Sequence, residues 1–396
     1  MPILRPSGSD FTSFVKAAAQ YVPAGGGGKP SKSGGVPVAL PGLGAVVRTS
    51  QVGALASPST SAVIINGVTP LAAAAAVAVV IRVLLGIVST LAGNAQGSVN
   101  GTGTGASFNN PSGVAVIPST GDIVVGDRSN SLIRLITPAG VVTTLATGFN
   151  SPRAVAVIPS TGVVVVADAS NNRIRLVTYP GGVVTTLAGS GSAAFADGQG
   201  AAASFSDPRG VAVTSTGDIV VADTGNHRIR LITPLGFVTT LAGSGSGAFA
   251  DGTGAGASFN SPFGVAVMPS SGVIIVADSG NNRIRLVTPA GVVSTLAGNA
   301  SAAFANGTGT GASFNNPTGV AVTSTGDIVV VDQSNHRIRF VTQAGVVTTL
   351  AGSGSASFAD GTGTGASFYN PEGVAVTSAG DVVVSDPANH RIRLIV

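Results

Sequence analysis

The sequence predicts an all-β fold, a β-propeller of six four-stranded blades, from three observations. One unit recurs six times, each copy reads as four short segments rich in β-branched residues, and no helical period follows residue 86. Four-strand units repeated in this way are typical of propellers. The prolines that open the units are Pro111, Pro152, Pro208, Pro262, Pro317 and Pro371.

The elements follow in the same order in each unit, and the third unit shows them well. The first strand is GVAV (210–213), and the turn STGD leads into the second strand, DIVVAD (218–223). The loop TGNH precedes the strictly alternating third strand RIRLIT (228–233), and the fourth strand FVTTLAG covers 237–243. Gly and Asn in the connections suit turns with positive φ. A phenylalanine before each proline is expected to wedge between blades.

The ring is predicted to close through a strand from the other end of the propeller. The sixth unit stops after its third strand, RIRLIV (391–396). A lone fourth-strand sequence, GIVSTLAGN, stands at 86–94, before the first complete unit. We therefore expect residues 86–92 to pair beside the C-terminal strand and complete the last blade, which removes an open sheet edge.

Residues 1–85 are predicted to form a separate N-terminal arm, and residues 86–396 the propeller. The arm reads as a mostly irregular, partly flexible segment with a short helix near residues 9–22 and a glycine-rich linker after it. Residues 71–85 fit either a helix or a strand. The start lacks a secretory signal, and a membrane span over 70–92 is not expected, because Arg82 lies within it and 86–92 reads as a strand.

Several motifs resemble the NHL-repeat family over residues 86–396. The pattern NPxGVAV…GDIVVAD…NHRIRLIT recurs, with Asn-His-Arg at 226–228, 335–337 and 389–391. The resemblance implies a six-bladed propeller. Members of the family look mainly like protein-binding or RNA-binding platforms, and a minority of similar propellers are lyases or lactone hydrolases that use a metal near the axis.

A recurrent Asp and Arg in each unit are predicted to be structural, with the Asp accepting N–H groups of the tight loop and pairing with the Arg. Asp197, Asp251 and Asp360 of the FADG motif are expected to close their loops by hydrogen bonds. No metal site is expected, since three equivalent histidines in different blades lie too far apart. The predicted turn and ion-pair residues are Asp127, Asp168, Asp223, Asp278, Asp332, Asp386, Arg134, Arg175, Arg230, Arg285, Arg339 and Arg393.

Function is expected where equivalent positions differ between units. The residue after each proline should ring the mouth of the central channel. The step from the first to the second unit is 41 residues against 54 to 56 elsewhere, so a notch is predicted there, flanked by Arg128, Arg153 and Arg209. Alanine at these three positions should weaken partner binding without lowering thermal stability. The binding-face candidates are Ser112, Arg128, Arg153, Arg209, Phe263, Thr318 and Glu372.

These features favour a non-catalytic interaction or structural protein that needs no cofactor. The propeller face would bind protein partners, and the arm would dock on neighbouring subunits of a larger assembly, such as a virion or surface layer. A propeller enzyme of the lyase or lactonase type is the first alternative, but the innermost strands carry no His, Glu or Asp pattern. An RNA-binding module is the second, disfavoured because residues 86–396 hold 14 Arg against 15 acidic residues. The sequence does not specify a cellular location.

Overall fold

The computed structural model describes residues 38–39, 46–50, 62–65 and 86–396. The chain divides into two units, residues 1–79 and 80–396. In the first, β1 (Val38–Ala39), β2 (Val46–Ser50) and β3 (Ala62–Ile65) form an antiparallel sheet in the order β1-β2-β3. These three short strands were not anticipated in the arm, which was expected to be mostly irregular. The helix predicted near 9–22 and the segment 71–85 lie outside the described residues. No helix in the described ranges has the length and apolar character to cross a membrane.

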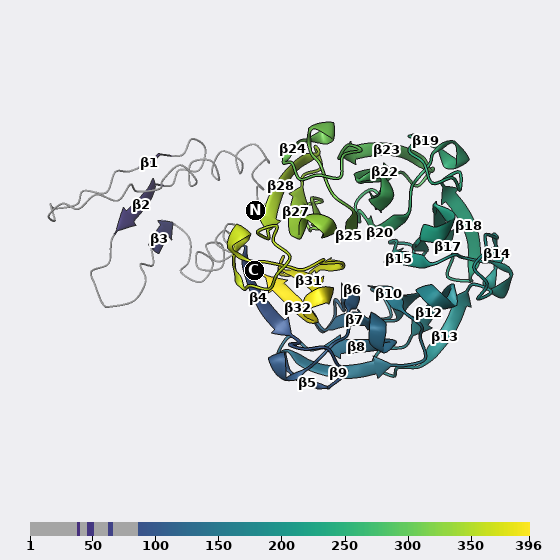
Figure 1. Cartoon of the computed structure of the whole chain (residues 1–396), viewed down its shortest axis with the longest axis horizontal. Coiled ribbons are helices and arrows are strands. Elements are labelled where there is room, and N and C mark those ends of the chain that lie inside the picture. Colours follow the sequence, from purple (N-terminus) through teal and green to yellow (C-terminus); the bar gives the residue numbers. More distant parts are fainter. Residues whose placement is uncertain (1–37, 40–45, 51–61, 66–85) are drawn as a thin grey trace, which may run out of the picture. The chain divides into compact units, whose positions relative to one another are not determined.

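The second unit is a ring of six sheets (Figure 1), and their innermost segments line a narrow central channel. The first strand of each blade lies innermost and pairs with the second strand, and a register shift after the opening proline recurs in five of these pairs. The innermost strands are β6 (Pro111–Val116), β10 (Pro152–Val157), β15 (Pro208–Val213), β20 (Pro262–Val267), β25 (Pro317–Val322) and β30 (Val374–Val376).

The second strand of each blade is buried along its whole length. Neighbouring blades cover both of its faces, which explains why these strands are continuous apolar runs rather than alternating ones. They are β7 (Ile123–Asp127), β11 (Val164–Asp168), β16 (Ile219–Asp223), β21 (Ile274–Asp278), β26 (Ile328–Asp332) and β31 (Val382–Asp386).

A single 3-10 turn connects the second strand to the third, and the residue after it has a positive φ of 52 to 59°. Asn, His or Ser occupies that left-handed position. The turns are η2 (Arg128–Asn130), η3 (Ala169–Asn171), η5 (Thr224–Asn226), η7 (Ser279–Asn281), η9 (Gln333–Asn335) and η11 (Pro387–Asn389).

The third and fourth strands complete the blades as predicted. The third strands are β8 (Leu132–Ile136), β12 (Arg173–Val177), β17 (Arg228–Ile232), β22 (Arg283–Val287), β27 (Arg337–Val341) and β32 (Arg391–Ile395). The fourth strands are β9 (Val141–Ala146), β13 (Val184–Ala188), β18 (Phe237–Ala242), β23 (Val292–Ala297), β28 (Val346–Ala351) and β4 (Ile87–Ala92).

Five blades have a fifth strand that the sequence prediction missed. The connection entering each of these blades adds a two-residue strand outside the fourth strand and then makes a 3-10 turn. Blade two, β10-β11-β12-β13, has four strands because its entering connection is short. The outer strands and turns are β5 (Gly101–Thr102), β14 (Gly198–Gln199), β19 (Gly252–Thr253), β24 (Gly307–Thr308), β29 (Gly361–Thr362), η1 (Gly103–Gly105), η4 (Gly200–Ala202), η6 (Gly254–Gly256), η8 (Gly309–Gly311) and η10 (Gly363–Gly365).

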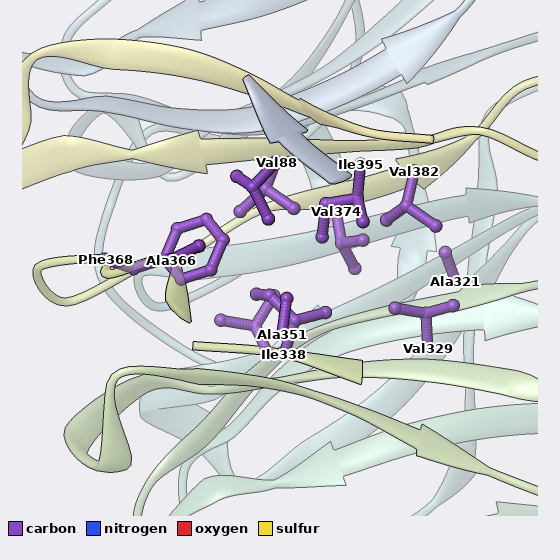
Figure 2. Packing of buried hydrophobic residues seen from close by; sticks show 12 residues of the cluster. Val88, Ala321, Val329, Ile338, Ala351, Ala366, Phe368, Val374, Val382 and Ile395 are labelled. Atoms are coloured by element: carbon purple, nitrogen blue, oxygen red, sulfur yellow. The ribbon is translucent and has the colours of Figure 1, made fainter. Parts of the chain in front are cut away.

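The predicted closure of the ring is confirmed. β4 pairs antiparallel with β32, with Val88 opposite Ile395, and lies beside it in Figure 1. The backbone groups of Ile87 and Val396 exchange two hydrogen bonds of 3.1 and 3.0 Å. The register shift between β32 and β4 also recurs in the other blades, so the N-terminal strand has the geometry of an ordinary fourth strand. Val88 packs among buried side chains that include Phe368 and Ile395 (Figure 2).

The phenylalanines act as wedges between blades, as predicted. Phe368 belongs to one cluster with Ile338 and Ala351 of blade five and Val382 of blade six. Each equivalent phenylalanine joins two neighbouring blades in the same way, which makes the six apolar clusters interfaces between blades. The buried phenylalanines are Phe108, Phe149, Phe205, Phe259, Phe314 and Phe368.

Candidate functional site

The variable residues that follow the inner prolines form a tight ring at one end of the channel. The residue directly after the variable position is glycine in five blades, and this glycine permits close approach of the inner strands. A Cβ at Gly210 would lie 2.1 Å from the carbonyl oxygen of Phe263, and one at Gly319 would lie 2.6 Å from that of Glu372. The inner strands therefore pack backbone to backbone, which brings the variable side chains together as the sequence predicted.

A cavity of about 400 Å³ opens at this ring. Five of the predicted candidates line it: three from inner strands, Glu372 from the segment before β30, and Arg128 from η2. Its lining residues are Arg128, Arg153, Arg209, Ser261, Phe263, Ser279, Gly280, Asn316, Gln333 and Glu372.

Glu372 is the polar centre of the site. Its side chain is only 5% exposed, and its carboxylate accepts a hydrogen bond from the Ser112 hydroxyl. Arg153 Nη1 lies 3.2 Å from Oε1, and Arg128 Nη1 lies 3.4 Å from Oε2. Thr318 Oγ1 donates to the Glu372 carbonyl at 3.0 Å. Ser112 and Thr318 are buried, so they hold the glutamate in place rather than face a ligand.

Phe263 provides an aromatic surface between two of the arginines. The guanidinium carbons of Arg153 and Arg209 lie 5.7 and 5.4 Å from its ring centroid. Arg209 also pairs with Asp207, with 2.6 Å between Nη2 and Oδ2, and its side chain is 30% exposed. Contacts of this kind orient guanidinium groups while leaving their N–H edges free to donate.

The charges of the site favour an anion. Three guanidinium groups meet two carboxylates, those of Glu372 and Asp207. Burial lowers the pKa of Arg153, and the nearby charges of Arg209 and Arg128 lower it further, while Glu372 raises it. Arg153 still remains protonated at neutral pH. The site therefore carries one more positive charge than its carboxylates neutralise, and a carboxylate or phosphate would relieve the repulsion between the arginines.

The structure separates the notch from the channel mouth. The connection that is short before blade two forms the fifth, outermost strand in the other blades. The missing part thus leaves its gap beside the fourth strand of blade two, whereas Arg153 and Arg209 lie on innermost strands (Figure 1). The arginines of the mouth do not flank the gap as we expected from the sequence.

The recurrent Asp and Arg side chains form one ion pair in every blade, with Nη1–Oδ2 distances of 2.6 to 3.1 Å, and both partners are buried in every blade except blade two. We had predicted that the Asp accepts backbone N–H groups of the tight loop, and this prediction is wrong. In blade five, Asp332 Oδ1 accepts the N–H of Asn315, which leads into the first strand, and the tight loop contributes only the side-chain amide of Asn335. Burial raises the pKa of Asp332 and outweighs the lowering by these hydrogen bonds and by Arg339. The pairs therefore tie three segments of each blade together.

The FADG aspartates also bind arginine rather than close their loops. Asp197, Asp251 and Asp360 each lie 2.6 Å from Nη2 of the buried arginine in the following blade. Asn100 and Asn306 take the same position, at 2.7 and 2.8 Å. The arginine thus gains a second polar partner in five blades.

The three histidines connect neighbouring blades. Nδ1 of His227, His336 and His390 accepts the backbone N–H of a residue entering the next inner strand, at 3.0 to 3.3 Å. The Oδ1 atoms of Asn172 and Asn282 accept the equivalent N–H in the blades that lack histidine. No group of three His, Cys, Asp or Glu able to hold a metal occurs among the described residues.

We expect the double variant His336→Asn/His390→Asn to lose less stability than the wild type between pH 7.5 and 5. Burial, and secondarily a neighbouring arginine, lowers the pKa of both imidazoles. The unfolded chain then binds more protons, so the contribution of the two histidines to stability is fully present above the unfolded pKa of about 6.5. It is lost as the pH falls from that value through the lower pKa of the folded state. Thermal melts at several pH values test this.

Asn282→His is the reciprocal variant. It places a histidine at a junction where Asn282 now accepts the inter-blade hydrogen bond, so it should make the stability of the protein depend more strongly on pH. Equal pH slopes in the wild type and the double variant would contradict this account of the inter-blade hydrogen bonds.

The sequence reasoning missed several residues of the mouth. Asp207, Ser261 and Asn316 directly precede inner-strand prolines and have positive φ. Their position beside the variable ring was readable from the repeat, since the residue before each proline enters the same face. Gln333 and Ser279 come from the second-to-third turns, which the sequence had placed at this face without selecting them.

Comparison with known proteins defines the class. The model of the family described as NHL repeat matches six segments of the chain, at residues 108–134, 149–175, 205–230, 259–285, 314–339 and 368–393. Together with the ring of blades, this defines a six-bladed propeller of a type that typically serves in protein binding. The chain belongs to the NHL-repeat family.

Similar proteins match parts of the chain. Protein SUPPRESSOR OF QUENCHING 1, chloroplastic, of Arabidopsis thaliana is 33% identical over 191 residues, which cover 45% of this chain and 18% of that protein. NHL repeat-containing protein 2 of Bos taurus is 42% identical over 81 residues, covering 20% and 11%. The matches thus span less than a fifth of these relatives.

Solved structures share the fold. A protein of unknown function from Bacteroides thetaiotaomicron superposes with a TM-score of 0.66 at 21% identity, covering 78% of this chain and 75% of that one. A streptogramin B lyase superposes with a TM-score of 0.51 at 13% identity, covering 80% and 99%.

Proposed function

We propose that this propeller is a non-catalytic binding module whose channel mouth takes a carboxylate or phosphate group of a protein partner. The observation that carries the proposal is the convergence of Arg128, Arg153 and Arg209 on one open cavity. Arginine presents paired N–H donors that match both anions, and Phe263 adds an apolar contact for the rest of a side chain. Arginine and aromatic residues in such a pocket are typical of the energetic centre of protein interfaces.

The same geometry argues against the lyase or lactonase alternative. Among the described residues, Glu372 is the only carboxylate that lines the cavity, and it is already engaged by the Ser112 hydroxyl and by two guanidinium groups. A carboxylate whose oxygens already have these partners is poorly placed to take a proton from a substrate. RNA binding is disfavoured by the nearly balanced charge of residues 86–396.

We further propose that residues 1–85 anchor the propeller in a larger assembly. This segment holds six basic residues and one acidic residue, whereas the propeller is close to neutral. An excess of positive charge in one segment suits attachment to an acidic surface.

Arg209→Ala tests the mouth without disturbing the fold. Its carboxylate partner, Asp207, is 40% exposed, so loss of the arginine leaves no buried charge, and we expect the unfolding free energy to change by less than about 0.5 kcal/mol. Peptides selected from an array of acidic and phosphorylated sequences should bind this variant at least about tenfold more weakly by calorimetry.

Arg337→Ala, which removes an arginine that does not line the cavity, is the matched control and should bind normally. Arg153→Ala is the less suitable variant, because it takes a donor from buried Glu372 and should lower stability, unlike the prediction made from the sequence. Unchanged peptide affinity of Arg209→Ala would refute the assignment of the mouth.

A further inference from the structure

The outermost segments of blades three, four and six dock through a short motif, well seen in blade three. The ring of Phe195 lies 3.8 Å from the guanidinium carbon of Arg228 and 4.8 Å from that of Arg230. Arg230 Nη2 then donates to the carbonyl of Ala196 at 2.8 Å and to Asp197 Oδ1 at 2.6 Å. An aromatic residue and a carboxylate two positions later thus bind two arginines of the third strand.

Backbone hydrogen bonds continue the docking. Gly198 and Gln199 pair with Val238 and Phe237 of β18. The N–H of Gly200 donates to the carbonyl of Gly236 at 2.9 Å, and the carbonyl of Gly200 accepts the N–H of Gly189 at 3.0 Å. The motif Phe-Ala-Asp-Gly-x-Gly is therefore a complete docking element, and Phe-Ala-Asp-Gly recurs at 249–252 and 358–361.

Blade two lacks this docking element, but it keeps the surface that receives the element in blades three, four and six, formed by Arg173, Arg175 and the edge of β13. Arg175 retains Asp168 at 3.1 Å and the Thr185 carbonyl at 3.4 Å, and its Nη2 has no hydrogen-bond partner among the described residues. The Arg175 side chain is 16% exposed, whereas its five counterparts are 0% exposed. Val183 is 59% exposed, against 46% for its counterpart Phe237. The edge of β13 is open within the described chain.

The groups that receive the motif in blade three are nevertheless present in blade two. Arg173 and Arg175 occupy the positions of Arg228 and Arg230, and the carbonyl of Gly182 stands where that of Gly236 accepts an N–H. Blade one makes an instructive contrast. Its connection carries Ser98 in place of the phenylalanine, and its third strand begins with Leu132 in place of the stacking arginine.

We propose that the edge of blade two binds, in trans, an extended segment of a partner protein with an aromatic residue two positions before an aspartate that is followed by glycine. The aspartate pairs with Arg175 Nη2, the aromatic ring stacks on Arg173, and the backbone after the aspartate adds the fifth strand to β13. This is recognition by strand addition, with specificity from the aromatic and acidic side chains. The surface lies apart from the channel mouth and does not depend on the function proposed for it.

The chain's own arm does not supply such a segment. Residues 1–85 contain one carboxylate, Asp10, which is preceded two positions earlier by Gly8 and followed by Phe11. The copies of the motif at 195–200, 249–254 and 358–363 are all engaged in their own blades. Charge and sequence pattern therefore both select a partner protein as the occupant.

A peptide with the sequence of residues 355–366, SASFADGTGTGA, is a direct probe. Titrated into the full chain, it should bind with a dissociation constant on the order of 10 to 100 μM. Peptides with Asp360→Asn or Phe358→Ala should each bind at least about tenfold more weakly.

A variant with the gap filled in cis provides the matched control. Replacing residues 147–148 by a copy of 352–367 gives blade two its own outer strand, and it should abolish peptide binding while leaving the melting temperature equal or higher. If that variant does not fold, the comparison of the three peptides on the wild-type chain still decides. Absence of binding at 1 mM peptide, which corresponds to a binding free energy weaker than about 4 kcal/mol, overturns the proposal. This holds whether the edge is bare or is already covered by residues 1–85 or by a second copy. Equal binding to the gap-filled variant, or equal affinity of the three peptides, overturns it as well.

Discussion

Asp332→Asn is expected to destabilise the propeller by about 3 to 5 kcal/mol, because it leaves the charge of Arg339 buried without a carboxylate. Both side chains are 0% exposed, and the other side-chain partner of Arg339, Asn306, is neutral. The amide can still accept the N–H of Asn315, so the loss reports mainly on the ion pair. Urea unfolding followed by circular dichroism measures the change in free energy.

Asp168→Asn is the matched control in blade two. Its partner Arg175 is 16% exposed, so water can solvate the unpaired guanidinium, and we expect a smaller loss of about 1 to 2 kcal/mol. Equal losses in the two variants would show that exposure of the arginine does not govern the strength of these pairs.

Val88→Asp should prevent the closing strand from packing. Val88 is 1% exposed and lies in the interface between blades five and six (Figure 2), so the substitution places a carboxylate among apolar side chains at a cost of about 3 kcal/mol or more. The melting temperature of the full chain and its resistance to proteolysis should both fall.

Ile87→Asp is the control for this variant, because the preceding side chain points to the other face and is 45% exposed. Its stability should stay close to that of the wild type. A wild-type-like melt of Val88→Asp would mean that the ring does not depend on β4.

The repeat made the blades and the closure predictable, because equivalent strands carry the same alternation and one strand was displaced to the other end. The fifth strands were missed since a Gly-Thr pair is too short to show any period. The ring of variable residues at the mouth followed from topology alone. The contact between Arg153 and Glu372, 219 positions apart, did not, because it depends on which rotamers fill the channel end.

The role of the FADG aspartates was also out of reach. Asp197 lies 33 positions from Arg230, and only the folded path of the connection brings the two together. A local turn was the natural interpretation of Asp-Gly in sequence. For the same reason the prediction from the sequence wrongly placed the notch beside the channel mouth. The length of a connection does not reveal along which edge of the sheet it runs.

The pairing of β4 with β32 also bears on how the protein is made. During synthesis the closing strand β4 emerges before the six repeated units and its partner β32 after all the other strands of the ring, so the ring cannot form until β32 has been made. Until then an apolar strand edge stays open, and such long-range pairing is slow and prone to aggregation. The nascent chain should therefore depend on chaperones for most of its time on the ribosome.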